Sequence, residues 1–414
     1  MEAELIEKYT ETILKTVALQ PGHYLLISSE PIHRPFAVKI AEKAYRMGAA
    51  YVDIEHPRRF APQLNRLRAD YCREEYLEII PPSLQELSRR RIDEKWVHIS
   101  IGGEENPDAM EGVDPQRSRM LNHGYAPIRR DEISARINAD IQWQGCYLPT
   151  ARTAARMLNC EPAQSAADQA FAYLADILML NDPDPAARWL EKVDELHRRS
   201  DALTAARLDS LHFTGPGTDL KIGLPEHHRW LGGAFTTADG TQFLPNLPTE
   251  EVFTSPHRQQ TEGRVTVTRP VMIKDVGGQL VDGAWFEFRE GRVVDFGAEK
   301  GRAALEELLG FDEAAGYLGE VALVDSNSAI FRSGQLWRNT LLDENAACHI
   351  ALGRGISTAL KNGEKLSDQK LLRQGINISQ IHTDFMIGSP DVEVRGTDIH
   401  GRKIEIITNG EFRI

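Results

Sequence analysis

Short apolar runs alternate with helical patterns in the first half of the chain. The runs that predict strands are residues 24–29, 49–54, 77–80 and 96–101. Between the first two, residues 36–46 carry Ala and Ile at helical spacing, and this strand–helix–strand length suits a right-handed parallel crossover. Residues 130–205 are mostly helical in pattern, with a break at a Pro-Asp stretch. We therefore predict an α/β N-terminal domain with a parallel sheet over residues 1–205.

The pattern changes near Arg207, where short alternating runs and turn signals take over. The runs that predict strands there are residues 264–268, 284–288, 292–296, 392–394 and 403–408. Residues 289–291 are a typical hairpin connection between two of them. Helices are predicted at about 301–309 and 344–360. The second domain, residues 206–414, is predicted to be a β-rich α+β domain that carries the candidate chemistry.

Composition and charge exclude several classes of protein. The chain has 414 residues, of which 41% are hydrophobic and 26% charged, as in soluble globular proteins. No apolar run approaches the ~20 residues that span a bilayer, and the acidic, amphipathic first residues predict a helix rather than a signal peptide. A net charge of −13 argues against a nucleic-acid partner. Four cysteines without a CxxC pair favour a reducing cytoplasm over a disulfide framework.

Several common catalytic motifs are missing from the sequence. The first predicted strand has no glycine-rich phosphate loop after it, and Gly353-Arg354-Gly355 lacks the lysine and spacing of a P-loop. The chain has neither a GxSxG nucleophile elbow nor an HExxH helix. These absences leave a serine hydrolase and a single-zinc metalloprotease without support.

Carboxylates and imidazoles gather instead in the second half. Asp343 and Glu344 open the predicted helix, where negative charge is favourable, and Asn345 and His349 would share one face of it. The neutral imidazole of His349 could bind a metal or donate to a backbone carbonyl, and the sequence leaves both open. Cys348 is more readily a packed residue than a nucleophile, because adjacent side chains on a helix point in different directions.

A second pair lies on a predicted strand. Alternation along residues 378–388 places His382 and Asp384 on one face, with Ile381 and Phe385 on the other. Two ligand-type side chains on one strand face can hold a metal ion, although such a strand could equally be an exposed edge.

Three further carboxylates lie upstream. Glu320 begins an apolar strand, where it is either a ligand or solvated. Glu250 and Glu251 could be ligands, or they could form the first turn of a helix capped by Thr249. Together with the residues above, these carboxylates favour two divalent cations over one and make a hydrolase the leading hypothesis.

Four segments resemble the signatures of the thermophilic metallo-aminopeptidases, the aminopeptidase T and aminopeptidase S group. They are residues 246–254, 318–324, 343–353 and 382–389, which match in order. The resemblance implies a homodimer that acts on peptides with a free N-terminus and holds two divalent ions per subunit, Zn²⁺, Co²⁺ or Mn²⁺. The ligands it implies are one of Glu250 and Glu251, with the spacing favouring Glu251, together with Glu320, His349, His382 and Asp384. Glu344 is implied as a further acidic member of the site, a ligand or a proton-handling group beside Glu320.

One position departs from the family pattern. The family places a tyrosine seven residues after the histidine that corresponds to His349, and this chain has Ile356 there. An isoleucine can neither bind a metal ion nor donate a proton. Besides an aminopeptidase, the sequence therefore leaves open a divergent metal-dependent amidohydrolase or dipeptidase, or a catalytically silent dimeric homologue.

Overall fold

The computed structural model describes residues 2–56, 62–273, 276 and 278–414. The chain forms two compact units, one of residues 1–193 with 234–249 and the other of residues 194–233 with 250–414. The domain boundary after residue 205 stays a prediction. Among the described residues no helix is both long and apolar enough to cross a bilayer.

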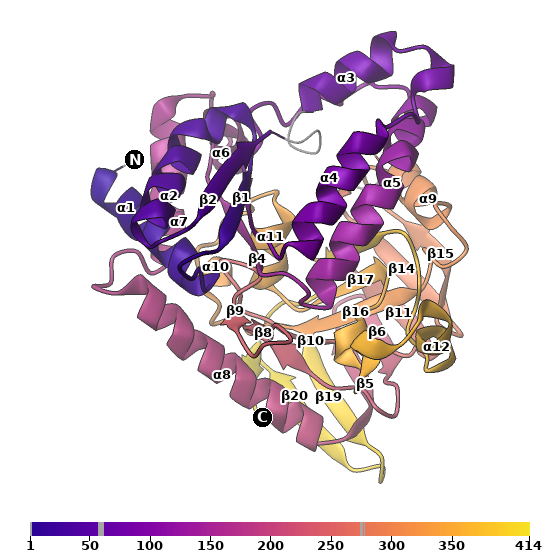
Figure 1. Ribbon diagram of the computed structural model, residues 1–414. Coiled ribbons are helices and arrows are strands. Elements are labelled where there is room, and N and C mark those ends of the chain that lie inside the picture. The colour runs from indigo at the N-terminus through magenta and orange to yellow at the C-terminus, as the bar shows by residue number, and fades with distance from the viewer. Residues whose placement is uncertain (1, 57–61, 274–275, 277) are drawn as a thin grey trace. The chain divides into compact units, whose positions relative to one another are not determined.

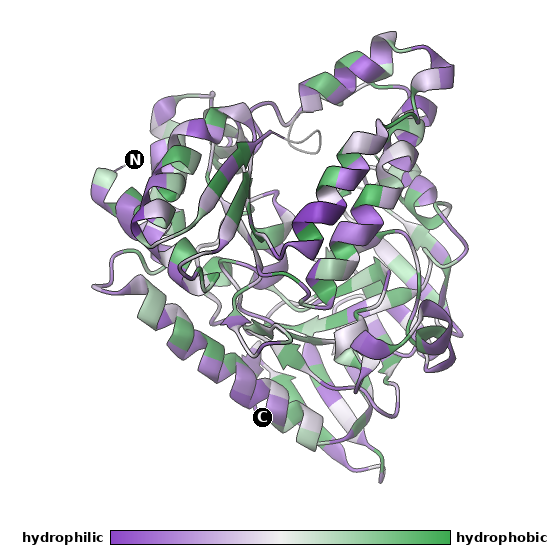
Figure 2. Ribbon diagram, viewed as in Figure 1, coloured by the Kyte–Doolittle hydropathy of each residue, from purple (hydrophilic) through white to green (hydrophobic). Residues whose placement is uncertain are grey.

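The first unit contains the predicted parallel sheet. Its strands are β1 (Tyr24–Ser28), β2 (Tyr51–Glu55), β3 (Val97–Gly102) and β4 (Trp143–Tyr147), and their order among the described residues is β2-β1-β3-β4. All three neighbouring pairs are parallel, which confirms the α/β prediction. The interior of β1 is apolar and buried, and Figure 2 shows hydrophobic residues along this strand. A two-stranded ribbon, β8 (Phe235–Thr236) with β9 (Gln242–Phe243), also belongs to this unit.

Helices connect and cover these strands (Figure 1). They are α1 (Ala3–Thr16), α2 (Arg34–Arg46), α3 (Pro62–Tyr71), α4 (Pro82–Asp93), α5 (Pro115–Ile137), α6 (Ala151–Leu158) and α7 (Gln164–Ile177), with 3-10 turns η1 (Pro31–His33) and η3 (Glu74–Tyr76). Helices α1 and α2 lie side by side, joined by Lys39 Nζ to Glu7 Oε1 at 2.7 Å. Helices α4 and α5 pair through Arg89 Nε and Asp131 Oδ2 at 3.1 Å.

Two predictions for this unit were wrong. Residues 77–80 form no strand, because Leu77 packs beside Ala69 and Leu121 in a small helical cluster. Strand β4 lies inside the segment predicted to be helical. The prediction missed it because five residues are too few to interrupt the helical pattern around them. Helix α8 (Pro185–Ala205) follows the Pro-Asp break, and Figure 2 shows hydrophobic and hydrophilic residues alternating along it.

The second unit is β-rich, as predicted. The larger sheet of the described residues has the order β15-β14-β11-β6-β5-β19-β20-β21 and is antiparallel. Its strands are β5 (Leu208–Gly215), β6 (Thr218–Gly223), β11 (Thr261–Thr266), β14 (Trp285–Arg289), β15 (Arg292–Gly297), β19 (Glu393–Asp398), β20 (Lys403–Thr408) and β21 (Glu411–Phe412). The predicted hairpin across residues 289–291 is present as the β14–β15 pair.

The smaller sheet of this unit has the order β18-β17-β16-β10-β7. Its strands are β7 (Leu231–Gly232), β10 (Val252–Thr254), β16 (Leu318–Leu323), β17 (His349–Gly353) and β18 (His382–Met386). A ribbon of β12 (Val271–Ile273) and β13 (Gln279–Val281) lies beside β18. One apolar core contains the inward-facing residues of both sheets, among them Phe213, Phe286 and Phe385.

Short helices complete the second unit. They are α9 (Arg302–Leu309), α10 (Ala329–Arg332), α11 (Thr340–Asp343) and α12 (Asp368–Arg373), with 3-10 turns η5 (Glu344–Ala346), η6 (Ser357–Ala359) and η7 (Gly363–Lys365). The helix predicted over residues 344–360 is therefore wrong. After one 3-10 turn the chain continues as β17, whose five residues are all buried between β16 and β18. A fully buried strand shows no alternation of polar and apolar residues, so the apolar run of β17 was compatible with a helix as well as with a strand.

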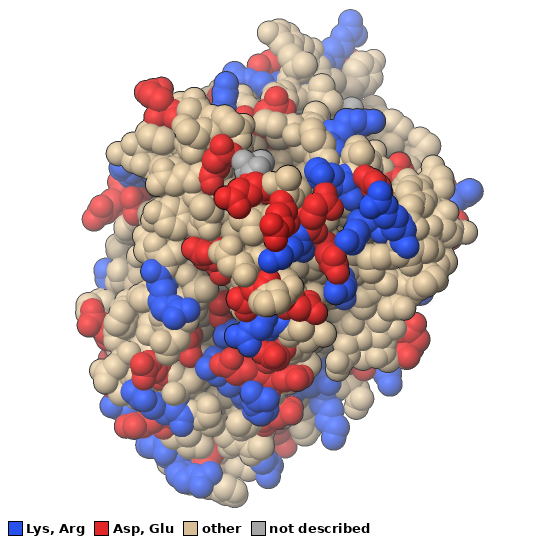
Figure 3. Space-filling view, turned by 90° about the vertical axis from the view of Figure 1, so that its left-hand side faces the viewer, with Lys and Arg blue, Asp and Glu red and all other residues tan. Residues whose placement is uncertain are grey.

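Charged side chains of both signs are interleaved on the face shown in Figure 3, without a continuous basic band.

Candidate metal centre

Neighbouring strands of the smaller sheet bring the candidate residues onto one face. Glu320 on β16 is in register with Ala351 on β17, and Ala351 is in register with Asp384 on β18. His382 lies two residues before Asp384, opposite Gly353, so it shares that face. The residue between these two carboxylates, Ala351 on β17, has a small side chain.

The same face receives His349 and Glu251. His349 begins β17 opposite Ala322, two residues after Glu320. Glu251 directly precedes β10, whose first residue pairs with Leu323. Alternation thus directs five side chains from four adjacent strands to one side, while Ile350 and Phe385 on the other side enter the apolar core.

A β-bulge at Gly319 makes this arrangement compatible with the core. Leu318 pairs with Leu352 and Glu320 with Ala351, so Gly319 is an extra residue on β16. The bulge keeps Leu318 in the apolar core while Glu320 faces the site. A Cβ atom at Gly319 would lie 2.3 Å from the carbonyl oxygen of Arg354, which explains the glycine.

The polar atoms of this face form two overlapping groups. Nε2 of His349 lies 3.0 Å from Oε2 of Glu251, and Nε2 of His382 lies 3.0 Å from Oε2 of Glu320 and 3.4 Å from Oδ1 of Asp384. The potential ligand atoms of Glu251, Glu320 and His349 lie within 4.8 Å of one another, and so do those of Glu320, His382 and Asp384. Glu320 belongs to both groups.

Backbone carbonyls orient both imidazole rings. Nδ1 of His349 lies 3.1 Å from the carbonyl oxygen of Ala347, and Nδ1 of His382 lies 2.8 Å from that of Arg354. A carbonyl can only accept, so Nδ1 carries the hydrogen in each ring and Nε2 faces the carboxylates. The two alternatives for His349, a carbonyl partner and a ligand position, are thus compatible. The sequence left a carbonyl partner open for His349 but could not identify either carbonyl, because backbone groups leave no side-chain signal.

Burial and mutual charge perturb the acids and bases of the site. Burial raises the pKa of Glu320, an effect that His382 partly offsets. Burial also favours the neutral form of Asp384, but His382 and His349 hold the pKa of that carboxyl below its usual value. Burial opposes protonation of His349, yet the adjacent carboxylate of Glu251 raises its pKa to about 10. Positive charge on the imidazoles therefore stabilises the carboxylates of the cluster, and a divalent cation would supply the same stabilisation.

Glu344 lies beside these groups but in neither of them. Burial raises the pKa of its carboxyl well above the usual value, and the negative charges of Asp384 and Glu251 raise it further. A buried carboxyl with a raised pKa is a candidate for proton transfer.

Glu250 and Asp343 face other partners. Oε1 of Glu250 accepts the backbone N–H of Ala329 at 3.3 Å, and Glu250 is absent from both ligand groups. Asp343 is 2% exposed and accepts the backbone N–H groups of Trp337 and Asn339, each at 3.0 Å. It ends α11 and does not open a helix as the sequence predicted. Glu250 and Glu251 also begin no helix, since a strand follows them.

Ile356 occupies the position where the family pattern has tyrosine. It is 8% exposed, and its backbone N–H donates to Oγ of Ser255 at 2.7 Å. Its aliphatic side chain supplies the site with neither a ligand nor a proton.

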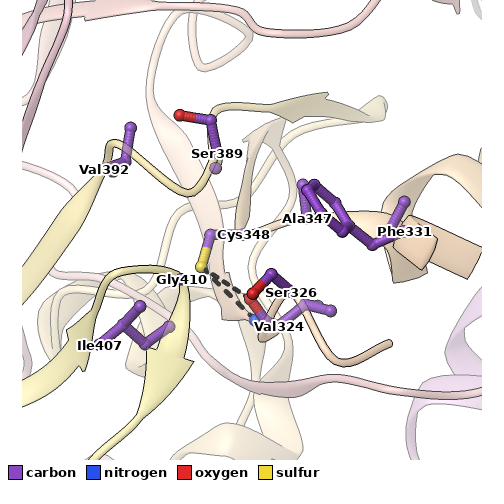
Figure 4. A pocket seen from close by; sticks show the side chains of 11 residues that line it. Val324, Ser326, Phe331, Ala347, Cys348, Ser389, Val392, Ile407 and Gly410 are labelled. Carbon is purple, nitrogen blue, oxygen red and sulfur yellow. Dashed lines mark hydrogen bonds between the residues drawn. The ribbon is translucent and has the colours of Figure 1, made fainter. Parts of the chain in front are cut away.

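Cys348 points away from the candidate centre, into a small pocket that is shown in Figure 4. Its Sγ donates to the carbonyl oxygen of Val324 at 3.3 Å, and burial raises the pKa of the thiol to about 12. A thiol with that pKa is not a nucleophile at neutral pH. Cys348 is a packed residue, as predicted, although strand alternation rather than a helix separates it from His349.

Comparison with known proteins links this arrangement to a group of peptidases. A family model described as thermophilic metalloprotease (M29) matches residues 2–412. Aminopeptidase 2 of Geobacillus stearothermophilus is 35% identical over 409 residues, which are 98% of this chain and 97% of that protein. Aminopeptidase T of Thermus aquaticus is 34% identical over 417 residues, which are 99% of this chain and 100% of that protein.

Solved structures agree with the sequence matches. The structure of wild-type AmpT from Thermus thermophilus superposes with a TM-score of 0.89 at 33% identity and covers 99% of both chains. A 2,5-dihydroxypyridine dioxygenase from Pseudomonas putida KT2440 superposes with a TM-score of 0.51 at 13% identity, covering 99% of this chain and 96% of the other, and shares the fold alone.

Proposed function

The chain belongs to the thermophilic metalloprotease family M29, which makes it a peptidase, and we propose that it is an aminopeptidase dependent on two divalent ions. The observation that carries the proposal is the pair of ligand groups sharing Glu320. A carboxylate common to two groups is the arrangement by which a protein holds two cations close together.

The chemistry of the donor atoms fits divalent cations. Each group combines carboxylate oxygens with an imidazole Nε2, ligands that Zn²⁺, Co²⁺ and Mn²⁺ accept. Among the described residues, Oε2 of Glu251 is buried without a hydrogen bond of good geometry, although Nε2 of His349 lies 3.0 Å away. Two atoms so placed are suited to share a cation. Glu251, Glu320 and His349 would hold one ion, and Glu320, His382 and Asp384 the other.

The chain's own residues would then organise peptide hydrolysis. When bound, the ions would supply Lewis acidity to activate water and polarise the scissile carbonyl. Glu344 would receive the proton of the attacking water and deliver it to the departing amine. Its burial beside Asp384 and Glu251 and its raised pKa support that role.

We further propose a substrate with a free amino terminus. The carboxylates of Glu251, Glu320 and Asp384, with Glu344 beside them, are potential hydrogen-bond acceptors. A protonated α-amine can donate three hydrogens to such acceptors, whereas an acylated nitrogen can donate only one. A homodimer in the cytoplasm, as the resemblance implies, belongs to the same proposal.

Hydrolysis of matched substrates tests the function. Leucyl- and arginyl-p-nitroanilide should be cleaved, N-acetyl-leucyl-p-nitroanilide should not, and EDTA followed by dialysis should remove the activity that Zn²⁺, Co²⁺ or Mn²⁺ restores. Preferential cleavage of the acylated substrate would identify a divergent amidohydrolase, for which Ile356 is the motivating observation. Metal binding without turnover of either substrate would identify a silent homologue.

A further inference from the structure

Three buried residues from separate segments are joined by hydrogen bonds next to the candidate metal centre. They are Glu250 before β10, Ser328 before α10 and Asn345 in η5, with exposed fractions of 7%, 1% and 0%. We call these three residues the latch. None of them belongs to either ligand group.

The bonds of the latch form a closed triangle. Oδ1 of Asn345 accepts the backbone N–H of Glu250 at 2.6 Å. Oγ of Ser328 donates to the carbonyl oxygen of Asn345 at 2.7 Å. The N–H of Ala329, which follows Ser328, donates to Oε1 of Glu250 at 3.3 Å and closes the triangle. Each side of the triangle connects two different segments of the chain.

The latch is adjacent in sequence to two groups of the proposed mechanism. Glu251 follows Glu250, and Glu344 precedes Asn345. Nδ2 of Asn345 donates to the carbonyl oxygen of Leu341 at 2.9 Å and lies 3.5 Å from Oε1 of Glu344, at the outer limit of a hydrogen bond. The Asn345 carboxamide therefore accepts from the segment that holds Glu251 and donates within the segment that holds Glu344.

We propose that Asn345 is a positioning residue that fixes Glu344 relative to the metal-binding Glu251, and that the latch is the structure through which it acts. An amide is required because one group must accept from Glu250 and donate toward Leu341 and Glu344. Alanine can do neither, and an aspartate can only accept. The roles of Glu251 and Glu344 rest on the proposed function, whereas the latch geometry does not.

A purely structural role predicts a different outcome from a positioning role. Loss of a buried hydrogen-bonding amide lowers stability wherever it occurs. Only a positioning residue should also change metal affinity and turnover in the protein that remains folded, since groups beside a metal site affect affinity or activity by roughly 10–100-fold.

The test compares Asn345→Ala with Gln144→Ala in the full-length protein. Gln144 is a matched control because its buried amide donates to Oγ1 of Thr16 at 2.9 Å and to the carbonyl oxygen of Leu244 at 3.0 Å, both in the first unit. The first readout uses Zn²⁺ alone, in competition with a chelator. The second is amide hydrogen exchange of the segment 249–254 in metal-free protein. The third is kcat and KM on leucyl-p-nitroanilide at saturating metal.

The proposal predicts that N345A binds Zn²⁺ about 10–100-fold more weakly, exchanges the 249–254 amides about tenfold faster and loses kcat by about 10–100-fold with little change in KM. Q144A should lower stability only. Wild-type Zn²⁺ affinity and wild-type exchange in folded N345A would overturn the proposal.

A second variant covers the case in which N345A does not fold. Ser328→Ala removes one side of the triangle and leaves the Asn345 side chain intact, so the same three readouts should move in the same direction by smaller factors. S328A with unchanged exchange and unchanged Zn²⁺ affinity would contradict the latch. Exchange and affinity are measured without substrate, so they test the latch even if the wild-type protein proves to have no peptidase activity.

Discussion

Substitution of Glu344 by glutamine separates proton transfer from metal binding. The amide has almost the shape of the carboxyl group but cannot accept and return a proton. Glu344 lies outside both ligand groups, so E344Q should keep the wild-type metal content. General acid–base catalysis contributes about 10²–10⁴-fold, so kcat should fall by that factor, which corresponds to about 3–5 kcal/mol in activation free energy.

The steady-state rate of leucyl-p-nitroanilide hydrolysis at saturating Zn²⁺ measures this loss of kcat. Elemental analysis of the same sample measures the number of bound metal ions per chain. The raised pKa of Glu344 means that burial of this carboxyl costs stability at neutral pH, and an amide avoids that cost, so the metal-free E344Q protein should unfold at no lower temperature than wild type. A kcat within about threefold of wild type would refute the assigned role. A loss of bound metal that matches the loss of activity would instead make Glu344 a ligand.

Three further results are expected. Glu320→Gln should lower bound metal from two ions to fewer than one per chain, because Glu320 belongs to both ligand groups. Glu251→Gln and Asp384→Asn should each leave about one ion, because each of these residues belongs to one group. Equal metal content in all three variants by elemental analysis would contradict the sharing of Glu320. Glu30 in the first unit is 3% exposed, and burial raises its pKa from 4.5 to about 7. The folded state therefore binds the proton more tightly, so the free energy of unfolding should fall by about 2 kcal/mol as pH rises from 4.5 to 7, after allowance for solvent screening. Urea unfolding of Glu30→Gln should lack that part of the pH dependence, and an unchanged slope would rule this out. Gly319→Ala should cost more than about 2 kcal/mol of unfolding free energy, since its Cβ would meet the Arg354 carbonyl oxygen at 2.3 Å; full stability by denaturant titration would argue against the bulge.

The layout of the fold was largely predictable from periodicity. Strand β1 is an apolar run flanked by turn residues, and the β14–β15 hairpin alternates around residues 289–291, so local patterns and final structure agree there. Strand β17 was not predictable in the same way. His349 to Gly353 is buried on both faces, and only its pairing with β16 and β18 selects strand over helix.

The candidate site was predictable in its members but not in its geometry. Glu251, Glu320, His349, His382 and Asp384 were all expected, and the structure brings them onto one sheet face, yet their roles as ligands stay a prediction. The sequence predicted that His349 would share a helix face with Asn345, and this was wrong because His349 begins strand β17.

Tertiary contacts give Glu250 and Glu251 different partners. Both glutamates precede β10 with similar surroundings in sequence, and only the structure shows that one faces Ala329 and the other His349. A sequence contains no direct record of such long-range partners, which explains why it left the pair unresolved.

Metal titration of the metal-free protein tests the central claim most directly. Release of leucine from a leucyl peptide is followed while Zn²⁺, or Co²⁺ in a parallel series, is added in steps of half an equivalent. The two-ion site that shares Glu320 predicts activity that rises to a plateau at two ions per chain and vanishes on chelation. Full activity in the metal-free protein, or a plateau at one ion per chain, would contradict it.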